Sequence, residues 1–396
     1  MPEQREGVIL TLNSGSSSVK FALYRVGAAE ELTVGGSMDR IGVSDGTFRA
    51  VRGREVLTDQ TLALPNHDAA LTVLLRWLHD HRSGPPVTAV GHRVVQGGPH
   101  HTRPQEITPA VLDDLRRLVP LAPNHLPGEI AGIEAVARPF PQMPQVACFD
   151  TAFHRAMPEL ARRFPLPRHL FDEGVERYGF HGLSYEYIVE ELRREAGAEA
   201  SRRVVIAHLG NGASLAAVRD GRPVDTTMGL TPLGGMVMGT RCGDLDPGVV
   251  LYLQREKGLS PDAVDELLNK RSGLLGISDI SPDMKDLLDR ESSDPRAAEA
   301  VGLFCRQGRK FIAAMAASAG GLDTLVFTAG MGEHSPPIRA RLCEGLDFLG
   351  VRIDPSHNAA NAPIISPDGS PVTVRVMKTN EELMIARQTW QMMNAE

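Results

Sequence analysis

Three short turns rich in small residues, each after an apolar stretch, contain the side chains best suited to hold a phosphorylated ligand. They are residues 13–18 with Lys20 close behind, residues 208–212, and residues 330–333. Small residues leave backbone N–H groups free to converge on an anion, and glycine lets a phosphate or a flat base approach closely. Each turn alone is an ordinary connection, and the phosphate-loop pattern GxxxxGK[ST] is absent from the sequence. Together, the three turns predict a nucleotide held between two lobes.

Two arginines lie among small residues, where neighbouring side chains give them little cover. Arg93 lies in the segment 91–98, and Arg241 lies in the segment 239–244. An exposed arginine is usually a solvated ion-pair partner, but one set among glycines at a strand end more often contacts an anionic ligand. Asp150 closes an apolar run and His181 lies in an aromatic, glycine-containing segment, and for both a structural role stays open beside a chemical one.

The elements that must position these residues alternate between strands and helices. Apolar or alternating runs predict two hairpins and two further strands, at residues 8–12 with 19–24, 204–209 with 214–218, 146–149 and 324–328. Capping residues followed by proline predict helix starts at Thr108-Pro109, Asp246-Pro247, Ser260-Pro261 and Ser281-Pro282. Ser184 is predicted to cap a helix that ends at Gly197, and a last helix covers 381–393. Each half contains a strand, a small-residue turn with an asparagine and a returning strand, and the alternation indicates an α/β fold.

Length and composition limit the class of protein. The 396 residues carry a net charge of −7 and are 42% hydrophobic, which is typical of a globular chain of two or three domains. The negative charge disfavours nucleic acid as a partner, and no apolar stretch approaches the length of a membrane span. The four cysteines are far apart and form no CxxC pair, so we expect reduced thiols in the cytoplasm rather than a disulfide framework or a zinc site.

Several longer segments resemble the acetokinase family, in the family's order and spacing from residue 8 to 387. They are residues 10–21, 91–98, 149–158, 177–184, 207–214, 238–247, 327–335 and 378–387. The resemblance implies an α/β fold of two duplicated ribonuclease-H-like domains with a cleft between them, as in the superfamily of acetate and sugar kinases, heat-shock ATPases and actin. The implied domains are residues 1–150 with 382–396, and residues 151–381, the second binding nucleotide. A homodimer is also implied.

The resemblance assigns a role to each matching position. Asp150, His181 and Arg241 match catalytic residues, and Asn13 and Glu381 match positions associated with magnesium. Arg93 matches the arginine that binds the substrate carboxylate, with an acyl pocket formed by Val95, Asn124, Phe180 and Pro232. The positions that match ATP contacts are Lys20, His208, Leu209, Gly210, Asn211, Gly212, Asp283, Met284, Lys285, Gly330, Met331, Gly332, Glu333 and His334.

Four positions depart from the family's usual pattern. Asn124 stands where leucine is usual, Tyr185 ends a segment that usually reads Gly-Thr-Ser-His, His334 replaces asparagine, and Met377-Lys378 replaces Ile-Pro. None of these changes removes a charged catalytic group. The first bears on acyl preference, and the third bears on nucleotide preference.

These observations predict a cytoplasmic kinase that transfers the γ-phosphoryl group of ATP reversibly to acetate, giving acetyl phosphate and ADP, with Mg²⁺ as cofactor and Mn²⁺ as an alternative. Both reactants are anions, so the site must bring cations to their meeting point. The alternatives are a propionate or butyrate kinase of the same superfamily, and a non-kinase ATPase of the actin-like fold. No separate peptide-binding segment follows residue 381 to support the last alternative.

Overall fold

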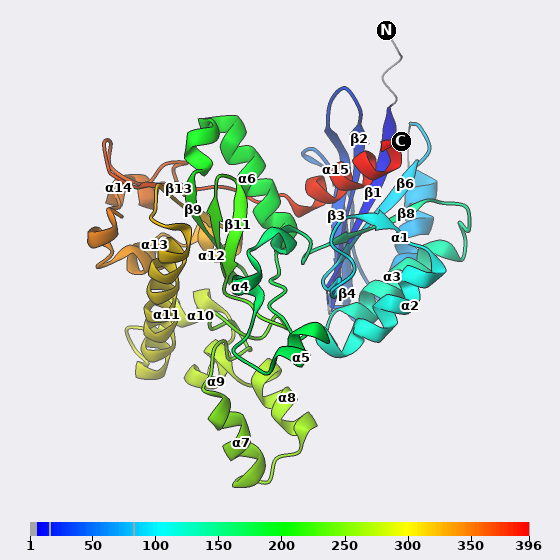
Figure 1. Cartoon of the computed structure of the whole chain (residues 1–396). Coiled ribbons are helices and arrows are strands. Elements are labelled where there is room, and N and C mark those ends of the chain that lie inside the picture. The colour runs from blue at the N-terminus through cyan, green and yellow to red at the C-terminus, as the bar shows by residue number, and fades with distance from the viewer. Residues whose placement is uncertain (1–5, 16, 82–83, 396) are drawn as a thin grey trace. The chain divides into compact units, whose positions relative to one another are not determined.

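The chain forms two compact units in the computed structural model, which describes residues 6–15, 17–81 and 84–395 (Figure 1). The first unit runs to Phe153 and resumes at Asn380, and the second unit is His154–Thr379. The divisions lie next to the boundaries predicted at 150 and 381. Among the described residues, every helix is too short or too polar to span a lipid bilayer.

The first unit is built on a sheet with helices on both faces. Its sheet order is β5-β4-β3-β2-β1-β6-β8-β7, in which β1 to β5 are antiparallel neighbours while β1, β6 and β8 run parallel. The strands are β1 (Gly7–Ser14), β2 (Ser18–Val26), β3 (Glu31–Asp39), β4 (Gly46–Arg52), β5 (Glu55–Leu62), β6 (Ala89–Val94), β7 (Gln105–Glu106) and β8 (Gln145–Phe149). The helices are α1 (His67–His81), α2 (Pro109–Leu118), η1 (Val119–Leu121), α3 (Leu126–Ala137), η2 (Phe153–Ala156, at the division between the units) and α15 (Glu381–Asn394).

Alternation along β1 explains why this sheet needs two helical layers. Leu10 and Leu12 belong to the core that includes residues of α1 and α3, whereas Ile9 packs with Ala386 of α15. All eight residues of β1 are buried, and side chains alternate between the two sides of a strand, so β1 is covered on both faces. Odd-numbered residues of β1 therefore share the face covered by α15.

The second unit has a smaller sheet of order β11-β10-β9-β12-β13, with α11 packed along its first three strands and α6 on β9. Its strands are β9 (Arg203–Leu209), β10 (Ala213–Arg219), β11 (Arg222–Thr226), β12 (Thr324–Thr328) and β13 (Thr373–Val376). Its first helices are α4 (Glu159–Arg162), α5 (Arg168–Asp172), α6 (Gly182–Ala196), η3 (Ala198–Ser201), α7 (Pro247–Arg255), α8 (Pro261–Lys270) and α9 (Gly273–Ser278). The remainder are α10 (Met284–Arg290), α11 (Pro295–Ala319), α12 (Ala329–His334), α13 (Pro336–Cys343), η4 (Asp347–Leu349) and α14 (Pro355–Ala359).

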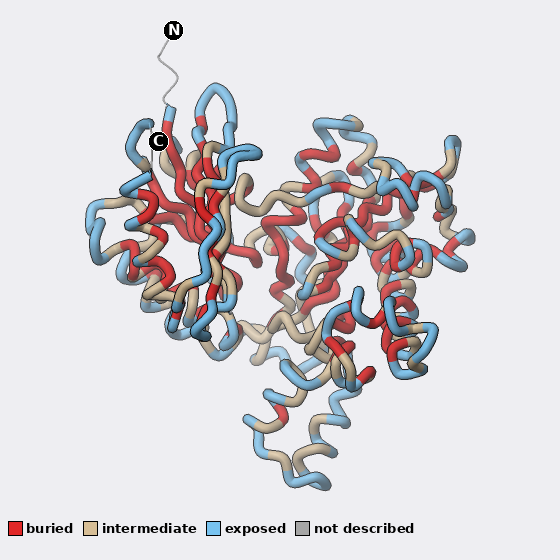
Figure 2. The backbone as a smooth tube through the Cα atoms, turned by 180° about the vertical axis from the view of Figure 1, so that it is seen from behind, coloured by how far each residue is buried: buried red, intermediate tan, exposed pale blue. Residues whose placement is uncertain are grey.

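The two sheets repeat one topology. The order β3-β2-β1-β6-β8 in the first unit corresponds to β11-β10-β9-β12-β13 in the second, with three antiparallel strands followed by two parallel ones. In both units the central strands are buried (Figure 2). The repeat that the sequence showed only as two similar hairpins is therefore a duplicated fold.

Both predicted hairpins, both single strands, the final helix and the helix starts at 108, 246 and 260 are confirmed. Three local predictions were wrong. Helix α6 ends before Gly197 as expected but begins at Gly182, so Ser184 lies inside it and its hydroxyl contacts His208 Nδ1 instead of capping. Helix α10 begins two residues after the predicted start, because the Asp283 carboxylate accepts the N-terminal amide hydrogen bonds.

The third wrong prediction concerns residues 330–333, which form the short helix α12 rather than a glycine turn. The chain enters α12 through Ala329, whose φ of 64° lies in the left-handed region. The carboxylate of Glu333 accepts a hydrogen bond from the Ala329 N–H at 2.9 Å and so closes this helical turn.

Candidate active site

The first unit brings three predicted residues together at the carboxyl ends of its parallel strands β1, β6 and β8. Arg93 donates from Nε and Nη2 to Asp150 Oδ2 at 3.1 and 2.5 Å. Arg93 Nη1 donates to Asn13 Oδ1 at 3.1 Å. Asp150 is fully buried and the Arg93 side chain is 15% exposed, so this ion pair is well shielded from water.

Strand alternation and a glycine explain why these side chains meet. Gly91 lies two residues before Arg93, and a Cβ built on it would lie 2.2 Å from Thr389 Oγ1 of α15. Cys148, two residues before Asp150, has its sulfur 3.8 Å from the carbonyl oxygen of Ile385. Arg93 and Asp150 therefore project from the face that α15 covers, which is also the face of Asn13.

The N-terminus of α15 adds carboxylates to this cluster. Asn13 Nδ2 donates to Glu381 Oε2 at 3.1 Å. Lys20 is the cross-strand partner of Asn13, so its side chain is on the same face. Burial and the neighbouring Glu381 raise the pKa of Glu382, while Lys20 and Arg93 oppose the shift. Burial alone would lower the pKa of Arg93, but attraction to Asp150 and Glu381 outweighs it and raises that pKa.

Oxygen atoms of Asn13 and Glu381 are the kind of ligand that Mg²⁺ takes. No group of three or more His, Cys, Asp or Glu side chains among the described residues is arranged to hold a metal ion alone. Mg²⁺ usually keeps several waters and binds through one or two carboxylates plus substrate phosphates. A sparse set of protein oxygens such as those of Asn13 and Glu381 therefore fits a Mg²⁺ ion that completes its coordination with water and substrate phosphates.

Glu129 of α3 is a buried acid that the motifs did not single out. Its Oε2 accepts a hydrogen bond from the Val95 N–H at 3.0 Å, and the residue is 2% exposed. Burial raises the pKa of Glu129 to about 8, against the opposing effects of that hydrogen bond and of Arg93. Val95 is buried, whereas Asn124, predicted for the same acyl pocket, lies on an exposed turn before α3.

The second unit positions His181 by a network of buried polar side chains. His181 Nδ1 lies 2.7 Å from Ser214 Oγ, and the Tyr185 hydroxyl lies 2.5 Å from the same oxygen. The rings of His181 and His208 are stacked with centroids 4.2 Å apart. Ser214 and His208 are cross-strand partners on β10 and β9, so this face of the sheet and α6 together fix the His181 ring.

Arg241 and His181 converge in front of Gly212. A Cβ built on Gly212 would lie 3.0 Å from both Arg241 Nη2 and His181 Nε2, so glycine lets both nitrogens come close to the backbone here. Arg241 Nη1 donates to the Pro232 carbonyl at 2.6 Å, which orients the guanidinium. Phe180 is buried, and its carbonyl oxygen is 2.9 Å from His154 Nε2.

A pocket of about 520 Å³ in the second unit contains most of the predicted nucleotide contacts. Leu274, Leu288 and Pro282 supply apolar surface suited to a flat base. The predicted residues that line the pocket are Gly210, Asn211, Asp283, Met284, Lys285, Gly330, Met331 and His334.

The other predicted nucleotide contacts lie beside this pocket or in the first unit. His208, Leu209 and Gly212 belong to β9 and its turn, and Gly332 and Glu333 lie in α12 behind the lining residues. Lys20 lies on β2 of the first unit. Ser16, in the first small-residue turn, lies outside the described residues.

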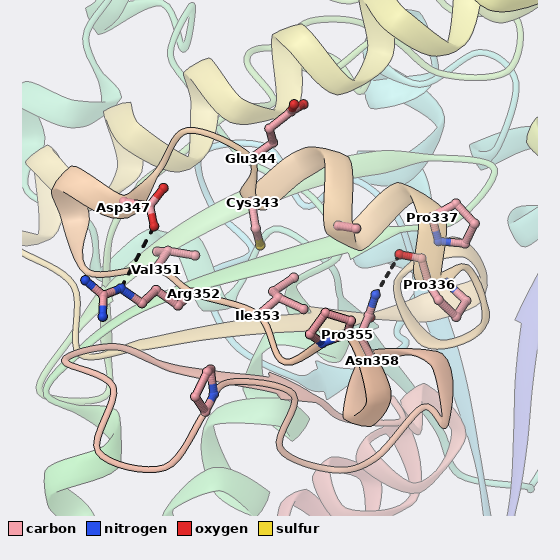
Figure 3. A pocket seen from close by; sticks show the side chains of 12 residues that line it. Pro336, Pro337, Cys343, Glu344, Asp347, Val351, Arg352, Ile353, Pro355 and Asn358 are labelled. Atoms are coloured by element: carbon pink, nitrogen blue, oxygen red, sulfur yellow. Dashed lines mark hydrogen bonds and ion pairs between the residues drawn. The ribbon is translucent and has the colours of Figure 1, made fainter.

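A larger cavity of about 620 Å³ lies between α13, α14 and the chain near η4, and none of the predicted site residues lines it (Figure 3). Next to it, Asn358 Nδ2 donates to the Pro336 carbonyl at 2.9 Å. The fully buried Arg339 donates to the Gly332 carbonyl, to Asn358 and to Asn361 Oδ1. Arg339 thereby connects α12, which borders the pocket of about 520 Å³, to α14.

Comparison with known proteins assigns the family. The model of the acetokinase family matches residues 8–387. The chain belongs to the acetokinase family. An acetate kinase of Rhodopseudomonas palustris is 47% identical over 394 residues, covering 97% of this chain and 98% of that protein. The solved structure of Porphyromonas gingivalis acetate kinase is 36% identical, with a TM-score of 0.87 and coverage of 98% and 100%. A propionate kinase structure from Francisella tularensis is also 36% identical, with a TM-score of 0.89 and coverage of 96% and 98%.

Membership in the acetokinase family settles the fold class and the kind of enzyme. The two repeated units have the fold of the acetate and propionate kinases, which belong to the actin-like ATPase superfamily. The chain is a kinase that uses ATP or ADP and transfers a phosphoryl group to a carboxyl acceptor.

Proposed function

We propose that this acetokinase is a reversible, magnesium-dependent acetate kinase, which converts acetate and ATP to acetyl phosphate and ADP. The observation that carries the proposal is the pocket beside β9 and α12, which is lined by residues predicted to contact ATP. The name shared by its 47%-identical relatives supports acetate as the acceptor.

In this proposal, different cationic side chains bind the two anionic reactants. We assign Arg93 to the carboxylate of acetate, because its guanidinium is held by Asp150 and Asn13. We assign Arg241 and His181 to the transferring phosphoryl group, because Arg241 Nη2 and His181 Nε2 converge at Gly212. Phosphoryl transfer depends on positioning and charge stabilisation more than on covalent chemistry, so these contacts are sufficient.

Asn13 and Glu381 would hold Mg²⁺ through their side-chain oxygens. The bound ion would neutralise charge on the phosphates of ATP. The Lys20 side chain, on the same face of the sheet as Asn13, would add a positive charge for the polyphosphate.

Asp150 has a positioning role in this proposal rather than a role as a general base. A carboxylic acid substrate has a pKa of about 4–5, so it is already ionised at neutral pH and needs no base. Asp150 Oδ2 accepts two hydrogen bonds from Arg93, which fixes the guanidinium that receives the substrate carboxylate.

The residues that we assign to the acyl group of the substrate are Val95 and Asn124 in the first unit and Phe180 and Pro232 in the second. Discrimination of one methylene in an apolar pocket is worth about 1–3 kcal/mol. We therefore expect acetate to be the preferred acceptor, with propionate within about a hundredfold in kcat/KM.

Hydroxamate trapping of acyl phosphate, with ATP, Mg²⁺ and a series of formate, acetate, propionate and butyrate, tests the proposed function. The highest kcat/KM is expected for acetate. A higher value for propionate or butyrate would make the chain a kinase of the longer acid, and ATP hydrolysis without acyl phosphate would exclude a carboxylate kinase.

We propose in addition that the enzyme acts as a homodimer in the cytoplasm, with no nucleic-acid or membrane partner. The cytoplasm supplies ATP, the phosphoryl donor, and the net charge of −7 disfavours anionic polymers. Light scattering at several protein concentrations measures the molar mass in solution, and we expect that of a dimer.

A further inference from the structure

A chain of buried hydroxyl groups ends on the ring of His181. Tyr185 of α6 and Ser214 of β10 are fully buried, and His181 is 9% exposed. The Tyr185 hydroxyl is 2.5 Å from Ser214 Oγ, and Ser214 Oγ is 2.7 Å from His181 Nδ1. The other ring nitrogen, Nε2, approaches Gly212 together with Arg241 Nη2, and a Cβ built on Gly212 would lie 3.0 Å from each of them.

The order of donors along this chain determines what His181 can do. A phenol hydroxyl readily donates its proton, and a serine hydroxyl that accepts from it can in turn donate its own proton. If Tyr185 donates to Ser214 and Ser214 donates to His181 Nδ1, then Nδ1 is an acceptor and the neutral ring carries its hydrogen on Nε2. The reverse order would put the hydrogen on Nδ1 and leave Nε2 unable to donate to a phosphoryl oxygen.

The surroundings of His181 favour a neutral ring. In this unit, the titratable or charged groups that face the ring include His208 of β9, Tyr185 of α6 and Arg241 of the loop after β11. Tyr185 also packs edge-on against His154 and His208. A positive charge on His181 would lie close to the Arg241 guanidinium, and like charges disfavour each other. A neutral ring donates from Nε2 only if its tautomer is fixed.

We propose that Ser214 and Tyr185 are positioning residues that hold neutral His181 as its Nε2–H tautomer, so that it donates to the transferring phosphoryl group beside Arg241. The inference rests on the proposed phosphoryl transfer. It assigns a role to Tyr185, one of the positions at which this chain departs from the family's usual sequence, and to Ser214, which the motifs had not marked as functional.

Ser214→Ala removes the donor to His181 Nδ1 without adding bulk, and Ser214→Thr keeps a hydroxyl as the matched control. We expect Ser214→Ala to lower kcat about 10²-fold, the usual effect of losing one oriented donor to a developing charge. The KM values for ATP and acetate should stay within about twofold, because the donor acts in the transition state. Ser214→Thr should recover at least a tenth of the wild-type kcat.

The pH profile separates a tautomer effect from a general loss of structure. In Ser214→Ala, kcat should rise relative to the wild type as the pH is lowered toward 5.5, because a protonated ring donates from Nε2 whatever its tautomer. Tyr185→Phe should show a smaller change of the same kind. A kcat ratio that does not vary with pH would overturn the proposal.

Nitrogen-15 NMR of the histidine side chains in the wild-type enzyme reports the tautomer without an activity assay. A His181 signal typical of Nε2–H, which Ser214→Ala converts toward Nδ1–H, is the expected result. A wild-type His181 with its hydrogen on Nδ1 would overturn the inference. If the wild type forms no acyl phosphate in the hydroxamate assay, the proposed function fails instead, and the two failures are distinguishable.

Discussion

At the scale of single residues, the two arginines of the site are oriented by different kinds of partner. The buried carboxylate of Asp150 and the amide of Asn13 hold Arg93. Arg241 donates to a backbone carbonyl, that of Pro232, and its other terminal nitrogen reaches the space in front of Gly212 beside His181. In the proposed reaction, the ion-paired guanidinium of Arg93 suits a ground-state carboxylate, and Arg241 would act where charge is redistributed during transfer.

Arg241→Ala should therefore lower kcat by roughly 10³–10⁵-fold, or about 4–7 kcal/mol, the range for arginines that stabilise transferring phosphoryl groups. ATP binding should persist, because Arg241 does not line the pocket of about 520 Å³ to which we assign ATP. Steady-state kinetics and ATP titration by calorimetry measure the two effects. Arg255→Ala, at an exposed position in the last turn of α7, is the control. A folded Arg241→Ala enzyme with near-normal kcat would assign Arg241 a structural role.

At the scale of elements, the final helix α15 does the most to assemble the first half of the site. It packs on β1, β2, β6 and β8, and its first residue, Glu381, accepts a hydrogen bond from Asn13. The helix lies close to β6 because Gly91 has no side chain. The position of Glu381 therefore depends on the close contact of Gly91 with Ile385 and Thr389, further along the same helix, and not on the glutamate alone.

Gly91→Ala should shift α15, because its Cβ would lie 2.2 Å from Thr389 Oγ1 and 2.6 Å from Ile385 Cγ2. Such overpacking typically costs about 1–3 kcal/mol of the free energy of unfolding. We also expect a higher Mg²⁺ concentration for half-maximal activity, because Glu381 moves with the helix. Urea unfolding and Mg²⁺ titration of activity measure these effects.

Gly302→Ala is the matched control for Gly91→Ala. Gly302 lies in α11, and a Cβ built on it has no atom within 4 Å. Alanine should stabilise this helix by about 0.5–1 kcal/mol. Equal stability of Gly91→Ala and wild type, with an unchanged Mg²⁺ requirement, would show that α15 tolerates the added methyl group.

Local sequence patterns predicted the helices and strands better than they predicted the long-range contacts between side chains. Period-two alternation and capping residues followed by proline are local signals, so the hairpins and the helix that starts at Thr108 could be predicted directly. The pairing of Ser184 with His208 is a long-range contact, and it changed the role expected of that serine. Glu129 escaped prediction for the same reason, because its burial under β6 depends on how α3 packs.

For the site, too, local signals were more informative than long-range packing. Asn13, Arg93 and Asp150 each end or follow an apolar strand, and parallel strands bring such ends to one edge of a sheet. The return of α15 to the first sheet had no local signal and was expected only from the resemblance to the family. The cavity of about 620 Å³ beside α13 and α14 had no sequence signal that we recognised.

At the scale of the whole molecule, the two units share one topology but present different groups at the ends of corresponding strands. The end of β1 and its neighbours in the first unit present charged groups, such as Arg93 and Asp150, whereas the corresponding turn after β9 presents glycines beside a pocket. Each unit also buries at least one histidine, His92 in the first and His154 in the second. These groups couple the stability of both units to pH.

The histidines should destabilise the protein as the pH falls. Burial lowers the pKa of His92 and of His154 to about 4, and hydrogen bonds to Gln145 and the Phe180 carbonyl only partly oppose this. A folded-state pKa below the unfolded value of 6.5 stabilises the fold at higher pH, and this stability is lost as the pH falls from about 6.5 to 4. The loss is on the order of 3 kcal/mol for each histidine.

Glu129 should have the opposite effect, because burial raises its pKa from 4.5 to about 8. The folded state then holds the proton more tightly than the unfolded state, so stability from this group is present below pH 4.5 and is lost as the pH rises to about 8. The free energy of unfolding, measured with urea from pH 4 to 9, should change less with pH on the alkaline side in Glu129→Gln than in the wild type. In His154→Gln it should change less with pH on the acid side. His100→Gln, at an exposed position, should leave both sides unchanged. If Glu129→Gln and the wild type lose stability equally between pH 5 and 8, Glu129 is ionised in the folded protein and does not couple stability to pH in this range.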